Sequence, residues 1–246
     1  MAFNQRIFYA CQAVAIAPRG TATLTTAHIV KGLQSVGMSS TFTLDQVFEM
    51  GQIAIYENIE EVADIEVTLE KVIDGYKLIY DLATNGECKT SIVASSKERT
   101  DVYLAVFDDG QDNATGTPKT VCMNSGMYVS SVSYSYSIDG SATESITMVG
   151  NDRFWNVTSG AIATAPTAIW STVSTGEFDD ETPLSGVVRR VDVDVSSTGS
   201  TLPEEVTLQR GDDAVNLSGG NHIQSISVST DFGQENIQEL GRFGPY

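Results

Sequence analysis

Apolar and polar residues alternate along many short segments of this chain, and this two-residue period predicts β-strands. In residues 63–72, the apolar side chains Ile65, Val67 and Leu69 face one way and the polar side chains between them face the other. Alternation, or a short apolar run bounded by turn residues, predicts further strands at 7–17, 91–96, 100–110, 128–140, 142–150, 187–195, 204–209 and 214–219.

Turn residues separate these strands. Residues 91–96 and 100–110 are predicted to form one hairpin, and 128–140 and 142–150 another that is joined by Asp139-Gly140. Many short strands separated by Gly, Asp, Asn and Ser are typical of all-β folds. We therefore expect a β-sandwich or small barrel with extended hairpins and short helical loops.

One unit of the sequence occurs twice. Residues 34–56 (QSVGMSSTFTLDQVFEMGQIAIY) recur without a gap as residues 224–246 (QSISVSTDFGQENIQELGRFGPY). Each copy opens with alternation that predicts a strand with one buried face and one face of small hydroxyls. The segments LDQVFEMG and QENIQELG then suggest one or two helical turns, which end at Gly51 and Gly241. The repeat is either an old duplication that serves only the fold or a surface used twice in assembly.

Two other regions complete the chain. Residues 74–85 suit a short helix at the edge of the sheet, and residues 151–183, which hold Trp155 and Trp170, are the least regular. We expect a β domain over 1–150, an irregular loop or insertion over 151–186, and further strands with the second copy of the unit over 187–246, or a single domain.

Composition narrows the function. With 41% apolar and 19% charged residues, the chain of 246 residues is a folded protein. Its 32 acidic and 14 basic residues give a net charge of −18. This charge argues against affinity-driven binding of nucleic acid, which requires clustered Lys and Arg. The acidity serves either solubility, including that of a salt-adapted host, or a surface that repels polyanions.

No motif for catalysis, a metal or a cofactor stands out. Cys11, Cys88 and Cys122 are widely spaced, and with only His28 and His222 they do not form a zinc-site pattern. The acidic turn at 107–113 lacks calcium-loop spacing. The apolar run at 7–17 is 11 residues long, whereas a bilayer needs about 20. We expect a non-enzymatic protein without cofactor, metal or membrane segment, made in a reducing cytoplasm.

Three stretches together resemble the tail tube proteins of tailed bacteriophages. These are IFYACQAVAIA, then LQSVGMSSTFTLDQVFEMGQIAIYENIEEVADIEVTLEKVIDG, then GMYVSSVSYSYSIDGSATESITMVGNDRFW. The resemblance implies subunits that form hexameric rings and stack into a hollow tube in the virion tail. It also implies contacts with sheath, tape measure or baseplate proteins, and passage of the genome without specific DNA binding.

Candidate site residues follow from the repeat and the charge. We expect Phe48 to pack against another subunit, with Val47, Met50, Ile237 and Leu240 also at the assembly interface. The second copy carries Gln238 in place of Phe48, so the two loops would face different neighbours. Acidic residues carried by strands are expected to face the channel, with these candidates: Glu66, Glu70, Asp192 and Asp194.

Other functions remain open at the level of sequence. The chain could instead form a single ring of the same channel, such as a terminator, neck or distal tail protein. An extracellular β-sandwich adhesin or carbohydrate-binding module is the second alternative, and Trp155 and Trp170 are its support. A ring would hold six chains, or three if the repeat duplicates a whole domain.

Overall fold

The computed structural model describes residues 12–21, 24, 26–51, 55–74, 76–84, 98–107, 118, 120–157 and 225–233. In this part of the chain the protein is all-β, as predicted. The strands are β1 (Gln12–Pro18), β2 (Leu33–Thr41), β3 (Leu44–Phe48), β4 (Ile55–Glu60), β5 (Asp64–Val72), β6 (Thr100–Val106), β7 (Thr120–Ser137), β8 (Thr143–Gly150), β9 (Asp152–Val157) and β10 (Ser225–Asp231). The described helices are a 3-10 turn (Thr26–His28) and α1 (Ile79–Ala83).

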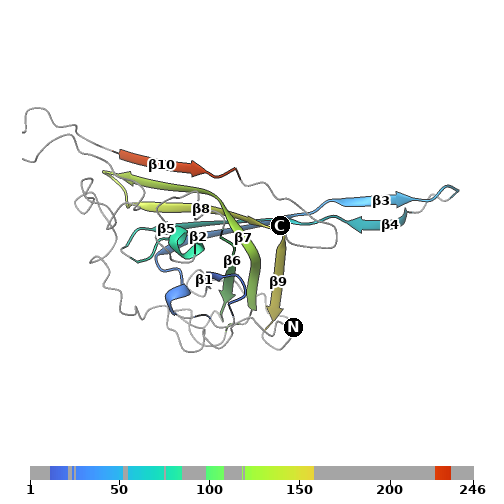
Figure 1. Cartoon of the computed structure of the whole chain (residues 1–246), viewed down its shortest axis with the longest axis horizontal. Helices are drawn as coiled ribbons and strands as arrows, with labels where there is room; N and C mark the ends of the chain where they lie inside the picture. The colour runs from blue at the N-terminus through green and yellow to red at the C-terminus, as the bar shows by residue number, and fades with distance from the viewer. Residues whose placement is uncertain are drawn as a thin grey trace, which may run out of the picture.

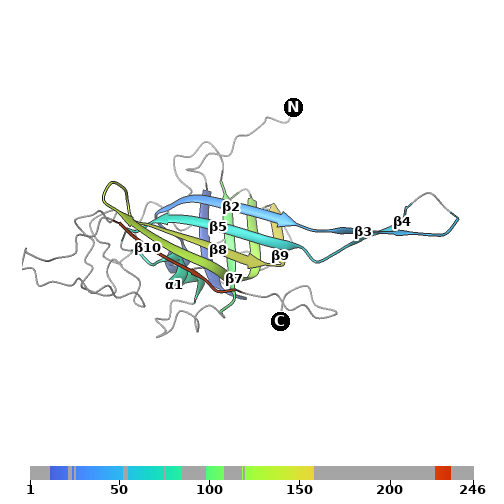
Figure 2. The ribbon, with the colours of Figure 1, turned by 90° about the horizontal axis from the view of Figure 1, so that it is seen from above.

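Most strands belong to one curled antiparallel sheet that forms a half-barrel (Figure 1). Its order is β1-β6-β7-β8-β5-β2, and β9 and β10 also pair with β7. The hairpin β3–β4 forms a separate two-stranded sheet and extends away from the half-barrel in both views (Figures 1 and 2). The expected barrel-like architecture with an extended hairpin is therefore confirmed.

Strand β7 is 18 residues long and belongs to both parts of the sheet. Its first part pairs with β6 and β9, and with β1 these form the small half-sheet. Its second part pairs with β8 and β10, and with β5 and β2 these form the large half-sheet. In Figure 2 the strands of the two half-sheets cross. This arrangement encloses a core at the corner made by β7.

A buried carboxylate fixes the corner. Gly126 has φ of 66°, a left-handed conformation that glycine adopts without steric cost. Asp101, almost fully buried on β6, accepts hydrogen bonds from Gly126 N and Ser125 Oγ, each 2.9 Å long. It also accepts one from Gly20 N at 2.9 Å. The charge-assisted bonds thus join the bend of β7 to the turn after β1.

The main core lies between the half-sheets. Ile65, Val67 and Leu69 of β5 are buried in it, as their alternation predicts. Helix α1 adds Ile79 and Leu82, and it packs against β1, β7 and β8. The prediction of a short helix within 74–85 is confirmed, but the helix covers the core instead of lying at the sheet edge. A second apolar cluster lines the opposite face of the small half-sheet.

The helical prediction for LDQVFEMG is wrong, because Leu44–Phe48 is strand β3 and pairs with β4. Leu44, Val47 and Phe48 have helical spacing, but all of β3 is exposed, so no buried face selects that period. The backbone groups instead bond to a neighbouring strand rich in β-formers. Gly51 has φ of 99° and lies in the turn after β3, so it does not end a helix.

Other strand predictions meet mixed outcomes. The hairpin of 128–140 and 142–150 is confirmed as β7–β8. Strand β6 lies within 100–110, whereas its predicted partner, 91–96, falls outside the described residues. The irregular reading of residues 151–183 is wrong at its start, because β9 pairs with β7. The strands expected at 187–195, 204–209 and 214–219 also fall outside the described residues.

Candidate functional site

The large half-sheet has one polar face, which we call the hydroxyl face. On each strand the residues of this face alternate with residues turned toward the core. Its residues are Ser35, Gly37 and Ser39 of β2, Glu66, Thr68, Glu70 and Val72 of β5, Thr143, Ser145, Thr147 and Val149 of β8, Ser131, Ser133, Ser135 and Ser137 of β7, and Ser225, Ser227 and Ser229 of β10.

The strand registers align these residues in rows across the sheet. One row crosses all five strands through Ser35, Glu70, Ser145, Ser133 and Ser229. Within it, Ser35 Oγ donates a hydrogen bond to Glu70 Oε2 at 3.3 Å. Apart from Glu70, the side chains of this row are small, so the surface that they form is low.

The hydroxyl face carries only negative charge. Its charged residues are Glu66 and Glu70, and Asp64 and Asp231 extend it at strand ends. Across the five fully described strands of the large half-sheet, the one basic side chain is Lys71. Lys71 is buried on the core side, where its Nζ lies 3.2 Å from Asp74 Oδ1 and donates to the carbonyl of Lys77 at 2.8 Å. No cation of these strands therefore reaches the hydroxyl face.

On the core side, Glu144 of β8 is fully buried and caps helix α1. Its carboxylate accepts hydrogen bonds from Ile79 N at 2.6 Å and Tyr80 N at 3.0 Å. Tyr134 Oη donates a third at 3.1 Å. Burial raises the pKa of Glu144 to about 7, although these hydrogen bonds and Lys71 favour the charged form. Burial, followed by the charge of Glu144, raises the pKa of Tyr134. This cluster ties α1 to the sheet.

The hairpin β3–β4 presents apolar side chains that its own chain does not cover. Phe48 is 61% exposed, and Met50 just beyond β3 is fully exposed. Further exposed apolar side chains on this hairpin are Leu44, Val47, Ile55, Tyr56 and Ile59. We call this set the apolar hairpin. Several large apolar side chains exposed on one short element commonly mark a protein–protein contact.

The two copies of the repeated unit form the two edges of the large half-sheet. Strand β2 pairs on one side with β5, and no described strand pairs with its other side. Strand β10 pairs with β7 at the opposite edge. At the end of β2, Arg153 Nη2 of β9 donates to the carbonyl of Ser39 at 3.1 Å, and Arg153 Nε donates to Asn124 Oδ1 at 2.6 Å.

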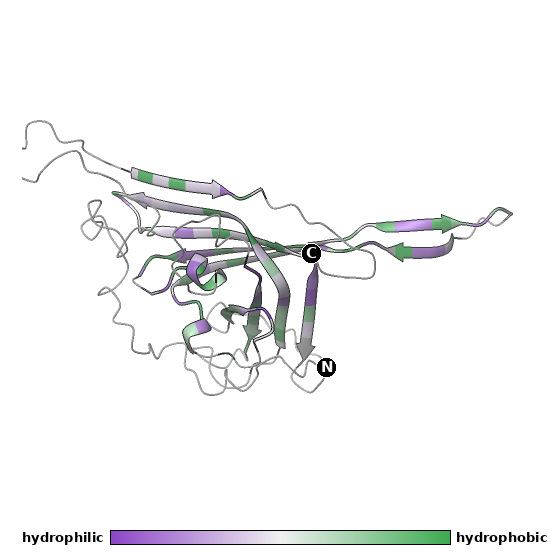
Figure 3. Ribbon diagram, in the orientation of Figure 1, coloured by the Kyte–Doolittle hydropathy of each residue, from purple (hydrophilic) through white to green (hydrophobic). Residues whose placement is uncertain are grey.

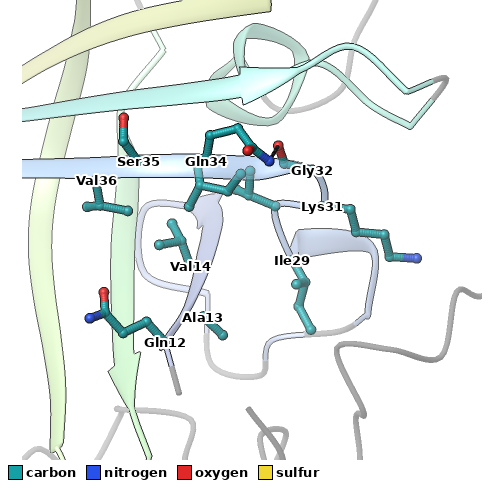
Figure 4. A pocket seen from close by; sticks show the side chains of 11 residues that line it. Gln12, Ala13, Val14, Ile29, Lys31, Gly32, Gln34, Ser35 and Val36 are labelled. Carbon is teal, nitrogen blue, oxygen red and sulfur yellow. Dashed lines mark hydrogen bonds between the residues drawn. The ribbon is translucent and has the colours of Figure 1, made fainter. Parts of the chain in front are cut away.

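A pocket of about 240 Å³ lies between β1 and the start of β2 (Figure 4). Val14 of β1, Ile29 and Val36 give it an apolar lining, and Gln12 and Gln34 stand at its polar part. Among the residues that the structure describes, no group of three His, Cys, Asp or Glu could hold a metal ion. Within the same residues, no helix has the length and apolar character needed to span a bilayer.

The structure places the candidate site residues in two separate regions. Glu66 and Glu70 lie on the hydroxyl face, and Val47, Phe48 and Met50 lie on the apolar hairpin. The other candidates are outside the described residues: Ile237, Leu240, Asp192 and Asp194. Sequence reasoning missed Ile55 and Ile59, although Ile55, Tyr56 and Ile59 are β-forming residues close together in one short segment.

The tryptophans considered for carbohydrate binding are not brought together by any described contact. Trp155 is 57% exposed on β9 beside Phe154, and Trp170 lies outside the described residues. The predicted turn at 107–113 is described only at Phe107, which is buried, so its acidic residues stay untested.

No protein-family model and no curated protein matches the sequence. Among solved structures, the fold is similar to a chain of the sheath–tube complex of an extracellular contractile injection system, with 12% identity, 63% of this chain and 95% of that chain covered, and a TM-score of 0.43. A chain of the tube-terminating cap of the anti-feeding prophage shows 12% identity, coverage of 64% and 95%, and a TM-score of 0.44. A chain of the anti-feeding prophage baseplate shows 11% identity, coverage of 64% and 100%, and a TM-score of 0.44.

Proposed function

We propose that this chain is a structural, non-catalytic subunit of a phage-tail-like tube. Copies of it join edge to edge in a ring, and the hydroxyl face lines the channel through which the genome passes. The observation that carries the proposal is the hydroxyl face itself, a surface made mostly of small hydroxyls and carboxylates that no basic side chain of its strands interrupts.

The edges of the large half-sheet support joining between copies. An exposed strand edge presents unpaired N–H and C=O groups and invites pairing with another chain. Among the described strands, none pairs with the outer side of β2 over Leu33–Thr41, where the Ser39 carbonyl accepts a hydrogen bond from Arg153. A closed ring pairs every edge, because each copy then receives the edge of the next. Ring closure therefore removes an aggregation hazard and turns several half-sheets into one wall.

The chemistry of the hydroxyl face suits the passage of DNA. Binding to the phosphate backbone depends on Lys and Arg that replace counterions, and this face provides none. Glu66 and Glu70 repel phosphates within a Debye length of about 8–10 Å. Hydroxyls keep the wall hydrated without adding charge. The carboxylates therefore repel a polyanion that moves along this wall, and no cation of these strands binds it.

The apolar hairpin supplies the second kind of contact. A two-stranded hairpin is at best marginally stable alone in water. Its exposed Phe48 and Met50 therefore gain from burial against another subunit, in the same ring or the next. In a complete tail, the outer surface and the ends of the tube would contact sheath, tape measure or baseplate proteins.

Electron microscopy of the purified protein tests the proposal. We expect rings with a central channel, stacked into tubes for a tube subunit and single for a terminator. Sedimentation at several protein concentrations should show the same oligomers. Monomers alone, at high concentration and in both 0.05 M and 1 M salt, would overturn the proposed function.

A charge-reversal variant tests the channel wall. The wild-type oligomer is expected not to retain duplex DNA in a mobility assay. Glu66→Lys combined with Glu70→Lys should create binding that salt abolishes, because the new cations contact phosphates. The matched control is Asp45→Lys with Glu57→Lys on the apolar hairpin, which adds the same charge away from the wall. Equal DNA retention by both variants would contradict a channel lined by the hydroxyl face.

A further inference from the structure

The repeated unit occupies equivalent positions at opposite edges of one sheet. Each neighbouring pair in the series β2, β5, β8, β7 and β10 is antiparallel, so β2 and β10 run in the same direction. Figure 2 shows β2 and β10 on the two sides of this half-sheet. Strand β10 therefore lies on β7 in the orientation that the β2 of a second copy would take if the antiparallel order continued.

The two strands match residue by residue in what they present. Val36 and Met38 of β2 are half-buried against the core, and so are Ile226 and Val228 at the corresponding places of β10. The residues between them are on the hydroxyl face in both strands. Strand β2 thus has the same apolar side and the same polar side as β10, which fits the β7 edge. Figure 3 shows the alternation of hydrophobic and hydrophilic residues along β10.

The register in which β10 pairs with β7 can be applied to a β2 strand in the same place. Ile226 lies opposite Tyr136 and Val228 opposite Tyr134. A β2 strand placed in the same register would set Val36 opposite Tyr136 and Met38 opposite Tyr134. Both tyrosines are buried in the core, so they offer an apolar edge to either strand.

An aromatic residue directly after the strand of each copy, Phe42 and Phe232, adds a further observation. Phe232 packs against the core, its ring stacks on Tyr80 at a centroid distance of 6.1 Å, and its N–H donates to the carbonyl of Ser130 at 2.9 Å. Its counterpart in the first copy, Phe42, is 55% exposed in its own chain. Phe42 is an aromatic residue of the same kind as Phe232, but it is not buried beside β2. The site that Phe232 occupies beside β7 would therefore also suit Phe42.

We propose that the β7 edge is the docking site for the β2 strand of a second copy of this chain, and that β10 is an internal copy of β2 which occupies this edge until assembly. Displacement of β10 leaves four strands per subunit, β2-β5-β8-β7, and the β7 of one copy then continues antiparallel into the β2 of the next. With β10 retained, the two free edges run in the same direction and meet in parallel. The inference rests on the proposed function only in taking the partner to be a second copy.

The geometry of β10 on β7 allows an engineered disulfide, called the lock below, that holds β10 on β7 and can be reduced again. Since Phe232 N bonds to Ser130 O, the inward-facing pairs of β10 and β7 form the hydrogen-bonded set, and the outward pairs lie between those bonds. Outward pairs such as Ser229 and Ser133 then have close Cβ atoms suited to a disulfide. Ser229→Cys with Ser133→Cys, oxidised, fixes β10 in place.

We expect the oxidised lock variant to lose the oligomer seen for the wild type, and the reductant dithiothreitol to restore it. Ser227→Cys with Ser135→Cys, an adjacent outward pair, repeats the test if the first variant misfolds. Normal assembly of the oxidised, folded variant would overturn this inference alone. Disulfide-linked oligomers from the lock pair would also overturn it, because they would mean that β10 itself passes between copies.

A second variant detects the docked strand. The transferred register sets Ser39 of one copy opposite Ser133 of the next. Within one chain they are separated by three strand spacings and by four residues along the strand, about 20 Å in all. Ser39→Cys with Ser133→Cys should give covalent oligomers on oxidation. The control, Ser35→Cys with Ser133→Cys, is four residues out of register and should not. Oligomers that form without the specific cross-link overturn the inference, whereas the lack of any oligomer in the wild type overturns the proposed function as well.

Discussion

Strand β5 and the hairpin β3–β4 contain the same kinds of apolar residue but differ in what covers them. Ile65, Val67 and Leu69 of β5 are buried, since β5 lies between β8 and β2 and faces the core. Leu44 and Phe48 on β3 are exposed, since β3 has one neighbour, β4, and no described layer above it. In β5 the apolar side chains stabilise the chain itself, whereas on the hairpin they are left exposed by the part of the chain that the structure describes.

The largest contrast is expected for leucine-to-alanine substitutions in the two regions. Leu69→Ala removes a fully buried side chain and leaves a cavity, which should lower the free energy of unfolding by about 2–5 kcal/mol. Leu44→Ala on the hairpin should change it by less than about 0.5 kcal/mol. Urea denaturation of the two monomeric variants measures the difference. Similar losses in both would show that the hairpin packs on its own chain.

The second effect concerns the buried carboxylate of Glu144. Its pKa is about 7 in the folded chain and 4.5 in a solvated reference, so the folded state holds the proton more tightly. The free energy of unfolding should therefore fall as the pH rises from about 4.5 to about 7, by up to ~3 kcal/mol. Glu144→Gln should lose this dependence.

Denaturation at a series of pH values between 4 and 8 checks this prediction. The control, Ser145→Ala, changes the next residue of β8, which faces the other way, and should keep the dependence of the wild type. A Glu144→Gln profile parallel to that of the wild type would assign the pH dependence to other groups.

How well the sequence predicts the structure differs between the same two regions. The strand at 63–72 and the hairpin β7–β8 follow from alternation, since one face of each is buried and burial selects the period. The helical interpretation of LDQVFEMG fails because no face of β3 is buried, so burial does not select the helical period there. A periodic pattern predicts secondary structure only where the chain itself covers the apolar side.

Local sequence patterns also predict only part of the candidate site. Glu66 and Glu70 share a face with the serines of β2, which alternation within each strand predicts. That β10 pairs with β7, and thereby places the two copies at opposite edges, is a pairing between distant segments that no local pattern contains. The repeat left open whether the unit serves only the fold or is a surface used twice, and only the topology shows where the two copies of the strand lie.

The third effect, on assembly, should appear at the hairpin. Phe48→Ala leaves the core intact and should weaken self-association by ~2 kcal/mol if Phe48 is a central interface residue. This corresponds to a loss of about thirtyfold in the association constant. Sedimentation equilibrium measures it, and Gln46→Ala on the same strand is the control. An unchanged association constant for Phe48→Ala would remove the hairpin from the interface.

The smallest effect should come from the hydroxyl face, where like charges repel across the assembled wall. Glu66→Gln combined with Glu70→Gln should strengthen assembly by less than about 1 kcal/mol in 0.05 M salt, since exposed charges interact weakly through water. In 1 M salt the Debye length falls to about 3 Å and the difference should vanish. Ser35→Ala, which removes the hydroxyl bonded to Glu70 without a change of charge, should show no such salt dependence. Assembly that weakens in low salt when the carboxylates are removed would mean that Glu66 and Glu70 bind a cationic partner surface, and they would then lie in an interface instead of on the wall of a channel.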